Sequence, residues 1–400
     1  MTDTNRFVAP GELLVGRGAV TEIGPLMAAR GSRALVVATA GGIDRHGDRV
    51  LDSLHAAGLD TTVYDGVEPD PTVATVEAGV DRYHAGDCDC LVALGGGSPI
   101  DAAKAIGVEA ATGTPIREHA TDRAGYETLD GPLPPLGAVN TTAGTGSEAT
   151  RSIVVTDEAT ATKFLVVSTA VVPDVAVEDP DLVASLPPSH TAFTGIDALT
   201  HAVEAYVSRA AWPMSDTLAR AAIPRLARWL PIAWENGDDL TAREETLIGQ
   251  LQAGQAFTNA SVALVHGMAR PFGAQLHLPH GLANGVLLPA VVDYSVEGSV
   301  ERYADIARLL DAADEGDADR TAAEQTAPAI RDLCEAVSLY GYLDAFADVP
   351  DRETYAGLVG EMADDALASG SPANNPRVPD RETIERLYLE VYDGALADHA

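Results

Sequence analysis

The 400-residue sequence is poor in basic residues and almost without lysine. It has 26 Lys plus Arg against 60 Asp plus Glu, for a formal net charge of −34, and its only lysines are Lys104 and Lys163. So acidic a chain excludes the ordinary nucleic-acid-binding proteins, which need a basic surface. Because 46% of the residues are apolar, the chain can still build a large core. We therefore expect a globular protein with no nucleic-acid partner.

The scarcity of lysine beside the excess of acid favours a protein from a halophile. Molar salt screens the repulsion between surface carboxylates that would strain the fold in dilute buffer. Lysine is ordinarily one of the commonest residues, so its near-absence is the more specific part of the signal. The alternative is an ordinary acidic enzyme.

Cysteine and long apolar runs are also scarce. Cys88, Cys90 and Cys334 are odd in number and lack the spacing of a metal site, which favours reduced thiols inside a cell. No run of about 18 uncharged apolar residues occurs, and residues 1–10 hold no apolar run typical of a signal peptide. We expect a cytoplasmic protein with no membrane partner.

Two kinds of periodicity divide the chain near residue 186. Short β-rich runs alternate with helical patterns at 33–39, 61–66, 90–96, 135–144 and 171–180. This alternation predicts a parallel sheet covered by helices. From 187 to 400 the apolar residues follow a 3.6-residue period, which predicts an all-α domain. Two prolines end one element at the boundary, and we expect a Ser or Thr to cap the next helix.

A run of glycines stands between a predicted strand and a predicted helix at 91–107. Gly95, Gly96 and Gly97 allow backbone amides to approach a phosphate, and Ser98 adds a hydroxyl at a helix N-terminus, where the dipole favours negative charge. The run is neither the spaced-glycine dinucleotide motif nor a Walker loop. It is compatible with a pyrophosphate site and with a plain strand-to-helix turn.

A second cluster, at 140–150, carries hydroxyl groups around two glycines. Thr141, Thr142 and Thr145 could hold a ribose or an adenine edge, although threonine and glycine are also common in turns. The two lysines add to this signal. If lysine was lost wherever the surface allowed, Lys104 and Lys163 stand where a compact ammonium is needed, unless they survive by chance.

A metal site is indicated by acids and histidines in two later segments. Asp197 and His201 are four residues apart in a strong helical pattern, so both side chains lie on one helix face. His266, His277 and His280 follow within 15 residues of one another. One carboxylate with imidazoles suits Fe(II), Zn(II), Mn(II) or Ni(II) better than copper(I) or an iron–sulfur cluster. A simple Asp–His ion pair is the alternative.

Four motifs in this order carry a resemblance: GGGSPID, TTAGTGSE, GIDALTHAVEAY and VHGMA followed by PHG. Together they resemble the iron-containing (iron-activated) alcohol dehydrogenase family, especially its lactaldehyde reductase and propanediol oxidoreductase branch, over nearly the whole chain. The resemblance implies a dehydroquinate synthase-like architecture: a Rossmann-like α/β dinucleotide-binding domain at 1–186 and a helical metal- and substrate-binding domain at 187–400. It places the dinucleotide and the metal in the cleft between them, and it implies a homodimer or larger assembly.

The resemblance also implies roles for single residues. The positions that match the family's metal ligands are Asp197, His201, His266 and His280. Those that match its nucleotide-binding residues are Gly95 to Ser98 and Asp101 for the pyrophosphate, with Thr141, Thr142 and Lys163 for the adenosine and ribose. Phe257 stands where the family has an aromatic residue facing the substrate and nicotinamide.

The chain departs from the family in its histidines. Arg270 stands where the family often has a second histidine that helps to relay a proton, and an arginine cannot be a general base at neutral pH. Arg270 could bind an anionic group of the substrate or pair with an acid. His277 could take over the relay, or hydrogen-bond a ligand.

A second departure concerns the choice of dinucleotide. Members that prefer NAD usually have an acid directly after the second strand to bind the ribose hydroxyl. Here Gly41 and Gly42 stand there instead, and with Arg45 they could accept the 2′-phosphate of NADP. We therefore favour NADP, while Asp44 nearby keeps NAD open. Asp70 replaces an asparagine usual in another nucleotide loop.

The resulting hypothesis is an NAD(P)-dependent, metal-dependent alcohol dehydrogenase. It would interconvert a small alcohol or diol with its aldehyde or ketone by hydride transfer, with Fe²⁺ expected and Zn²⁺ or Mn²⁺ as alternatives. Two other functions stay open: reduction of a carboxylated substrate of the maleylacetate or hydroxyacid type, with Arg270 as the anion clamp, and a non-redox metal-dependent hydrolase or lyase on the same fold.

Overall fold

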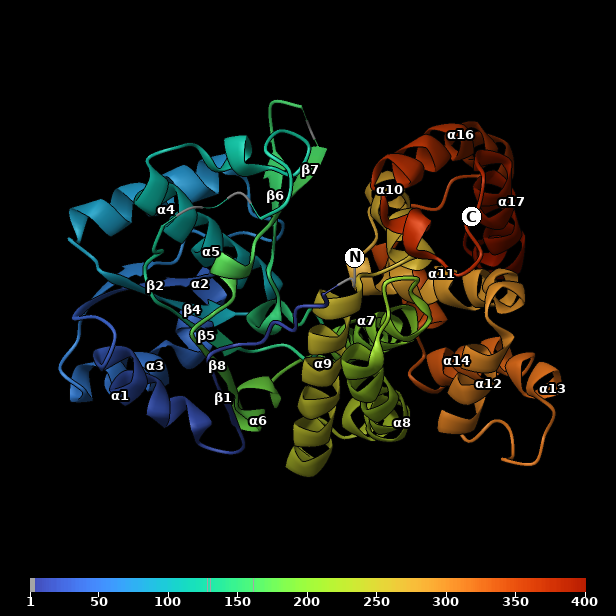
Figure 1. The fold of residues 1–400 in the computed structure, drawn as a ribbon, viewed down its shortest axis with the longest axis horizontal. Helices are drawn as coiled ribbons and strands as arrows, with labels where there is room; N and C mark the ends of the chain where they lie inside the picture. Colours follow the sequence, from blue (N-terminus) through green and yellow to red (C-terminus); the bar gives the residue numbers. More distant parts are fainter. Residues whose placement is uncertain (1–3, 128, 130, 161) are drawn as a thin grey trace. The chain divides into compact units, whose positions relative to one another are not determined.

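The computed structural model describes residues 4–127, 129, 131–160 and 162–400 (Figure 1). The chain forms two compact units, one ending at Ser185 and the other beginning at Leu186. The first contains an α/β sheet and the second is built from helices, as the periodicity predicted. Each unit is described by itself.

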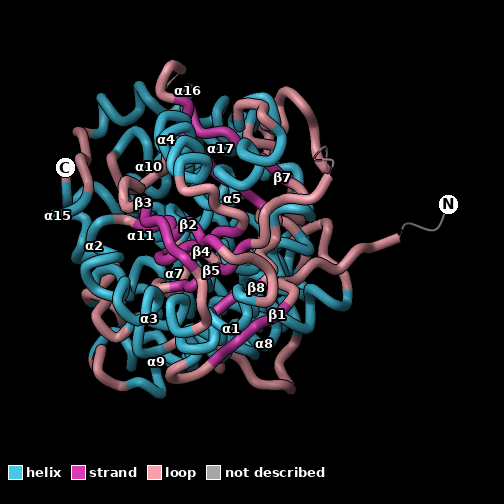
Figure 2. Tube along the Cα trace, turned by 90° about the vertical axis from the view of Figure 1, so that its left-hand side faces the viewer, coloured by secondary structure: helices cyan, strands magenta, loops and turns pink. Residues whose placement is uncertain are grey.

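The first unit is organised around a parallel sheet. Its strands are β1 (Glu12–Val15), β2 (Arg33–Ala38), β3 (Asp60–Tyr64), β4 (Cys90–Gly95), β5 (Leu136–Asn140) and β8 (Val175–Glu178). They follow the order β1-β8-β5-β4-β2-β3, and every pair is parallel. Figure 2 shows these strands as magenta segments of the tube. All five predicted strands are present, and the short β1 is an addition to them.

Helices cover both faces of this sheet. On one side α4 (Val73–Ala85) and α5 (Gly97–Thr112) pack on Leu35 and Val37 of β2. On the other, α1 (Ile23–Ala28) and α3 (Asp48–Ala56) pack on Val36 (Figure 1). Successive strand residues point to opposite faces, so a strand covered on both sides reads as a continuous apolar run.

A separate antiparallel hairpin, β6 (Ser152–Asp157) and β7 (Thr162–Val167), completes the regular structure of this unit. Its strands were not predicted, because polar residues interrupt their apolar pattern. The shorter helical segments are η1 (Ala19–Glu22), α2 (Ala40–Gly42), η2 (Ile43–Gly47), η3 (Ile116–His119), η4 (Ser147–Ala149), η5 (Thr169–Val171) and α6 (Pro180–Val183).

The second unit consists of helices joined by loops. The longer ones are α7 (Pro188–Val207), α8 (Pro213–Glu235), α9 (Leu240–Ala260), α10 (Leu264–Leu276), α11 (His280–Ser295), α12 (Val300–Leu309), α14 (Thr326–Ala336), α16 (Arg352–Ala368) and α17 (Arg381–Val391). The shorter ones are η6 (Val296–Gly298), α13 (Asp319–Ala323), η7 (Tyr340–Tyr342), α15 (Leu343–Phe346), η8 (Ser371–Asn374), η9 (Tyr392–Leu396) and η10 (Ala397–His399).

Helix α7 lies in the core of this unit and is packed against α8, α9 and α11. Small residues allow the close packing: a Cβ on Gly195 would lie 2.1 Å from Leu230, and one on Gly281 of α11 would lie 2.0 Å from the Phe193 carbonyl oxygen. The prediction that a Ser or Thr caps α7 is wrong. Its N-cap is Pro187, without a side-chain cap hydrogen bond, and Pro188 at the first helical position has no amide to satisfy.

Within the described residues, no helix combines the length and the apolar character that crossing a membrane requires.

Candidate metal and nucleotide sites

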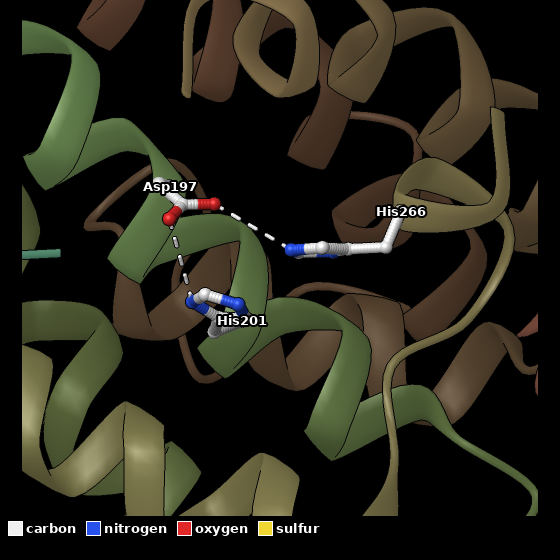
Figure 3. A group of neighbouring side chains, drawn as sticks. All are labelled: Asp197, His201 and His266. Atoms are coloured by element: carbon white, nitrogen blue, oxygen red, sulfur yellow. Dashed lines mark ion pairs between the residues drawn. The ribbon is translucent and has the colours of Figure 1, made fainter. Parts of the chain in front are cut away.

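Three buried side chains of the second unit point toward a common centre (Figure 3). Asp197 and His201 project from one face of α7, and His266 approaches from α10. Their donor atoms all lie within 4.8 Å of one another. Asp197 Oδ1 is 3.5 Å from His266 Nε2, and Asp197 Oδ2 is 4.0 Å from His201 Nδ1.

The fourth predicted ligand also reaches this cluster. His280 begins α11, and its Nε2 lies 3.7 Å from Asp197 Oδ1. Unlike the other three side chains, that of His280 is 47% exposed. The structure therefore brings together all four residues that were predicted from segments far apart in the sequence, with His280 on the accessible side.

The geometry fits a divalent ion better than a plain ion pair. Ligand atoms about 2.1 Å from a tetrahedral ion lie about 3.4 Å from one another. The Asp197 distances to His266 and His280, 3.5 and 3.7 Å, are close to that value and long for hydrogen bonds. One carboxylate and three imidazoles also form a donor set that suits a first-row divalent metal.

The charges in this cluster are strongly coupled. Burial alone would raise the pKa of the Asp197 carboxyl, but His201, His280 and His266 hold it well below its usual range. Burial alone would lower the pKa of His266, but the Glu204 and Asp197 carboxylates raise it to about 9. The site thus keeps a buried carboxylate ionised, which a bound cation also requires.

Two residues that the sequence reasoning missed also belong to the cluster. Glu204 Oε2 lies 2.5 Å from His266 Nδ1, and Asn284 Nδ2 donates to Asp197 Oδ1 at 2.7 Å. Asn284 Nδ2 is also 3.2 Å from Nε2 of both His266 and His280. Helical spacing could have found them, because Glu204 follows His201 by three residues and Asn284 follows His280 by four.

In the first unit, the two predicted nucleotide loops contact each other. A Cβ on Gly96 would lie 2.7 Å from Thr142 side-chain atoms, and one on Gly97 would lie 3.1 Å from Thr145. Gly95 has φ +150°, which side chains rarely allow. The glycines are therefore required by the turn and by the packing of the loops. The N-terminus of α5 has no side-chain cap hydrogen bond, and the first amides of a helix have no partner within the helix itself.

The second loop is shaped by a buried pair that gave no sequence signal. Asn140 Nδ2 donates to the Thr142 carbonyl oxygen at 2.6 Å and to Glu178 Oε2 at 2.9 Å. Asn140 Oδ1 accepts from the Thr142 amide at 3.1 Å. These bonds set the direction in which the chain leaves β5, and so where Thr141 and Thr142 lie.

Lys104 and Asp101 are buried on α5, beneath these loops. Lys104 Nζ donates to the carbonyl oxygens of Ser147, Thr150 and Ser152 at 2.7, 2.9 and 3.0 Å. Asp101 Oδ2 accepts from the Val154 amide at 3.0 Å. Burial raises the pKa of Asp101 to about 6 and lowers that of Lys104 to about 8, and each charge partly offsets the effect on the other. The compact ammonium of Lys104 is needed for carbonyl groups of the protein itself.

Lys163 and Asp70 lie together at the surface of the same unit. Lys163 Nζ is 2.7 Å from Asp70 Oδ1, and the Asp70 amide donates to Ser98 Oγ at 3.3 Å. Asp70 has φ 57°, the left-handed region. Three residues assigned to cofactor binding by the resemblance are thus neighbours at the end of the glycine loop.

In the turn after β2, one of the two glycines hydrogen-bonds to a residue of the turn itself. The Gly42 amide donates to Thr39 Oγ1 at 2.9 Å, so Thr39 caps α2 and the Gly42 amide is already hydrogen-bonded. A Cβ on Gly41 would lie 3.4 Å from the Arg45 guanidinium, which is exposed. Of the predicted phosphate-binding groups here, Gly41 and Arg45 lie together.

Comparison with known proteins identifies the family of the chain. Residues 10–180 match the iron-containing alcohol dehydrogenase model, and 191–392 match the C-terminal model of that family. The chain is 39% identical over 375 residues to 1,3-propanediol dehydrogenase of Citrobacter freundii, covering 93% of this chain and 94% of the relative. The chain belongs to the iron-containing alcohol dehydrogenase family.

Further relatives of this alcohol dehydrogenase agree with that assignment. Lactaldehyde reductase of Escherichia coli (strain K12) is 37% identical over 371 residues, covering 92% of this chain and 95% of the relative. A solved 1,3-propanediol oxidoreductase superposes with a TM-score of 0.91 at 37% identity, covering 97% of this chain and all of that one. The protein is an oxidoreductase that interconverts alcohols with aldehydes or ketones and depends on a metal, and its family implies Fe²⁺ and NAD(P) as cofactors.

The predicted catalytic residues of this dehydrogenase lie in different surroundings. Phe257 on α9 stacks on His201, with ring centroids 4.2 Å apart and planes at 16°. Arg270 is half-buried on α10, one turn after His266. His277 ends α10 with φ 54°, is 75% exposed, and its Nδ1 lies 3.0 Å from Asp348 Oδ2. The structure thus brings Phe257 to the metal cluster and shows His277 in an exposed contact with Asp348.

Proposed function

We propose that this dehydrogenase acts on a short alcohol or diol through an ion held by Asp197, His201, His266 and His280. The observation that carries the proposal is the convergence of one carboxylate and three imidazoles at separations of 3.5 to 4.0 Å from Asp197. Relatives named for 1,3-propanediol, lactaldehyde, methanol and butanol support a small substrate. Fe²⁺ is the expected ion, because the family is named for iron.

The residues around the ion would prepare the substrate oxygen for reaction. When bound, a divalent ion supplies positive charge that stabilises negative charge on that oxygen in oxidation and polarises a carbonyl in reduction. His280 borders the accessible side, so substrate would enter there. The Phe257 ring covers one face of His201 and offers the substrate an apolar wall. The transferred hydride goes to or from the nicotinamide, which the first unit would hold.

In the first unit, we assign the pyrophosphate to the amides of Gly95 to Ser98 at the N-terminus of α5. Thr141, Thr142, Thr145 and Lys163 would line the adenosine part. NADP is favoured over NAD because the Arg45 guanidinium lies over Gly41, where it can meet a 2′-phosphate. Binding of NADP and NAD to the wild type and to Arg45→Ala tests this choice, and an unchanged preference in Arg45→Ala would remove it.

A carboxylated substrate is the second candidate, and Arg270 favours it. Arg270 stands one turn after His266 on α10, and its position is half-buried. A guanidinium there could bind a carboxylate of the substrate through two parallel hydrogen bonds. A solved sulfoacetaldehyde reductase from Bifidobacterium kashiwanohense, at 26% identity and TM-score 0.84, is named for an anionic aldehyde. In Arg270→Ala, selective loss of activity toward carboxylated aldehydes would support this candidate, and equal loss for neutral ones would count against it.

We further propose that the enzyme works in a salt-rich cytoplasm as a homodimer or larger assembly. The net charge of −34 with two lysines supports adaptation to salt, as does a halo-thermophilic brine-pool alcohol dehydrogenase at 27% identity and TM-score 0.86. The three cysteines are free and buried, as suits a reducing compartment. Light scattering and melting curves across potassium chloride concentrations test the assembly and the salt adaptation.

The central experiment loads anaerobically purified protein with Fe²⁺ or Zn²⁺ in high salt. Short alcohols and diols are then offered with NADP or NAD, and formation of the reduced dinucleotide is followed by its near-ultraviolet absorbance. We expect turnover that is lost on chelation and restored by the ion. A His266→Ala variant with full activity would remove the proposed site.

A further inference from the structure

Glu204 is a buried carboxylate that the proposed chemistry does not use. It lies on α7, on the same helix face as Asp197 and His201, and its side chain is almost fully buried. Its two oxygens have different partners. Oε1 accepts from the Val265 amide at 2.6 Å, and Oε2 lies 2.5 Å from His266 Nδ1.

These contacts determine where the proton of His266 resides. A carboxylate only accepts hydrogen bonds, so Nδ1 must carry the proton that it shares with Glu204 Oε2. In the neutral ring, the form that binds a metal, the lone pair is then on Nε2, the nitrogen that lies 3.5 Å from Asp197 Oδ1 and 3.2 Å from Asn284 Nδ2 at the centre of the cluster. The Val265 amide holds the other oxygen, so the carboxylate has little freedom to turn.

A buried carboxylate is costly unless its oxygens are satisfied by good donors. Both donors of Glu204 come from adjacent residues at the start of α10, and one of them is a predicted ligand. If Glu204 only joined α7 to α10, its hydrogen bond with the Val265 amide would be enough. The bond to the ring acts specifically on the ligand atom on the other side of the imidazole.

We propose that Glu204 is a positioning residue that fixes the Nδ1–H tautomer and the orientation of His266, and thereby sets how tightly the ion is held. The proposal rests on the metal site of the proposed function. The carboxylate places negative charge on the far side of the ring, which makes Nε2 a stronger donor to a cation.

Glu204→Gln is the decisive variant, because it keeps the size of the side chain and removes the charge. A carboxamide has one acceptor and one donor group, whereas Val265 and His266 both offer a proton to Glu204. Either one contact is lost, or His266 moves its proton to Nε2, the atom needed by the ion. The matched control is Glu178→Gln, since Glu178 is another buried glutamate that accepts a side-chain hydrogen bond, from Asn140, in the other unit.

The experiment measures the Zn²⁺ dissociation constant of the full-length protein by competition with a chelator. It also measures the ring ¹⁵N shifts of its histidines, which report the tautomer. We expect Glu204→Gln to bind Zn²⁺ about 10- to 100-fold more weakly, with altered His266 shifts, and Glu178→Gln to bind as the wild type does. Binding by Glu204→Gln within twofold of the wild type, or an unchanged tautomer, would overturn the proposal.

Two further results separate the possible failures. If Glu204→Gln does not fold, Glu204→Asp takes its place: it keeps the charge but is too short to reach both partners, so weaker binding is again expected and unchanged binding overturns the proposal. If the wild type itself binds no Zn²⁺ or Fe²⁺, the proposed metal site fails before Glu204 is tested. Stoichiometric binding by the wild type with equal binding by the variants removes only the role of Glu204.

Discussion

The two units build their sites from different materials. The loops of the first unit use glycine, threonine and backbone groups, and they are held from beneath by Lys104 and Asn140. The cluster of the second unit uses charged and polar side chains that α7 and α10 bury in a helical core. Backbone amides at a helix N-terminus can bind a phosphate while they stay exposed to solvent. A buried carboxylate, in contrast, stays ionised only where cations or strong hydrogen-bond donors surround it.

This difference predicts how each site fails. Changes in the metal cluster leave a buried charge uncompensated and are severe, while changes in the loops shift the backbone and are graded. Substitutions in either unit should also leave the ligand of the other unit bound.

The largest effect is expected from Asp197→Asn. Removing the one carboxylate among the four predicted ligands should lower metal affinity by more than about 100-fold, because loss of partners that merely orient a ligand already costs about 10- to 100-fold. Metal analysis after gel filtration, with NAD(P) binding measured in parallel, checks this. His190→Ala, which changes an exposed histidine on the same helix, should keep both ligands. Retention of the ion by Asp197→Asn would contradict the assignment.

Next in size is the contrast between the two lysines. Lys104→Ala removes a buried ammonium from three carbonyl groups and leaves Asp101 without its cation, so we expect a loss of about 3–5 kcal/mol in the free energy of unfolding. Lys163→Ala breaks only an exposed pair with Asp70 and should cost less than about 1 kcal/mol. Urea denaturation of both variants measures the difference. Equal losses would show that burial does not distinguish these lysines.

A smaller, pH-dependent effect is expected at Asp101. Burial raises the pKa of its carboxyl from 3.8 to about 6 in the folded protein, so the folded state holds the proton more tightly than the unfolded state. The contribution to stability is present below pH 3.8 and is lost as the pH rises through about 6. Relative to Asp101→Asn, the wild type should therefore lose about 1–3 kcal/mol over that window.

Urea midpoints of both proteins, measured at intervals between these two pH values, test this expectation. A constant difference between the proteins across the window would show that the carboxyl of Asp101 titrates normally.

The smallest effect is expected from Gly96→Ala. The new Cβ would lie 2.7 Å from Thr142, so the two loops must separate slightly, and dinucleotide binding should weaken about tenfold. Titration with NADP measures it. The control is Gly357→Ala on α16, where a Cβ meets nothing within 4 Å. Metal content should be normal in both variants. Loss of the ion from Gly96→Ala would show that the two sites are not independent.

The elements that could be predicted are those with a strong local pattern. Strands such as β4 are continuous apolar runs because both faces of the sheet are covered, and α7 has an unbroken 3.6-residue period. Strand β1 has only four residues, and polar residues interrupt the apolar pattern of the β6–β7 hairpin. Neither therefore has a periodic pattern long enough to predict a strand. The cap of α7 was misjudged because a proline at its start leaves no amide to satisfy.

The residues of the metal cluster show the same division. Asp197 and His201 follow from helix geometry, and His266 and His280 from the rarity of histidine clusters and from the resemblance. Glu204 and Asn284 stood at helical spacing from these residues but carried no signal of their own, since an acid or an amide on a helix is ordinarily exposed to solvent.

By itself the sequence determined the strands β2 to β5 and β8, the change to a helical second half, the acidic charge and the motifs of the family, because these depend on composition and on spacing along the chain. Only the tertiary structure decided which partners each buried polar group contacts. Lys104 donates to carbonyl groups of its own unit, the Gly42 amide donates to the Thr39 side chain, and Glu204 on α7 contacts His266 on α10. The physical reason is that burial makes a polar group depend on its neighbours in space, and those are set by how the helices and loops pack.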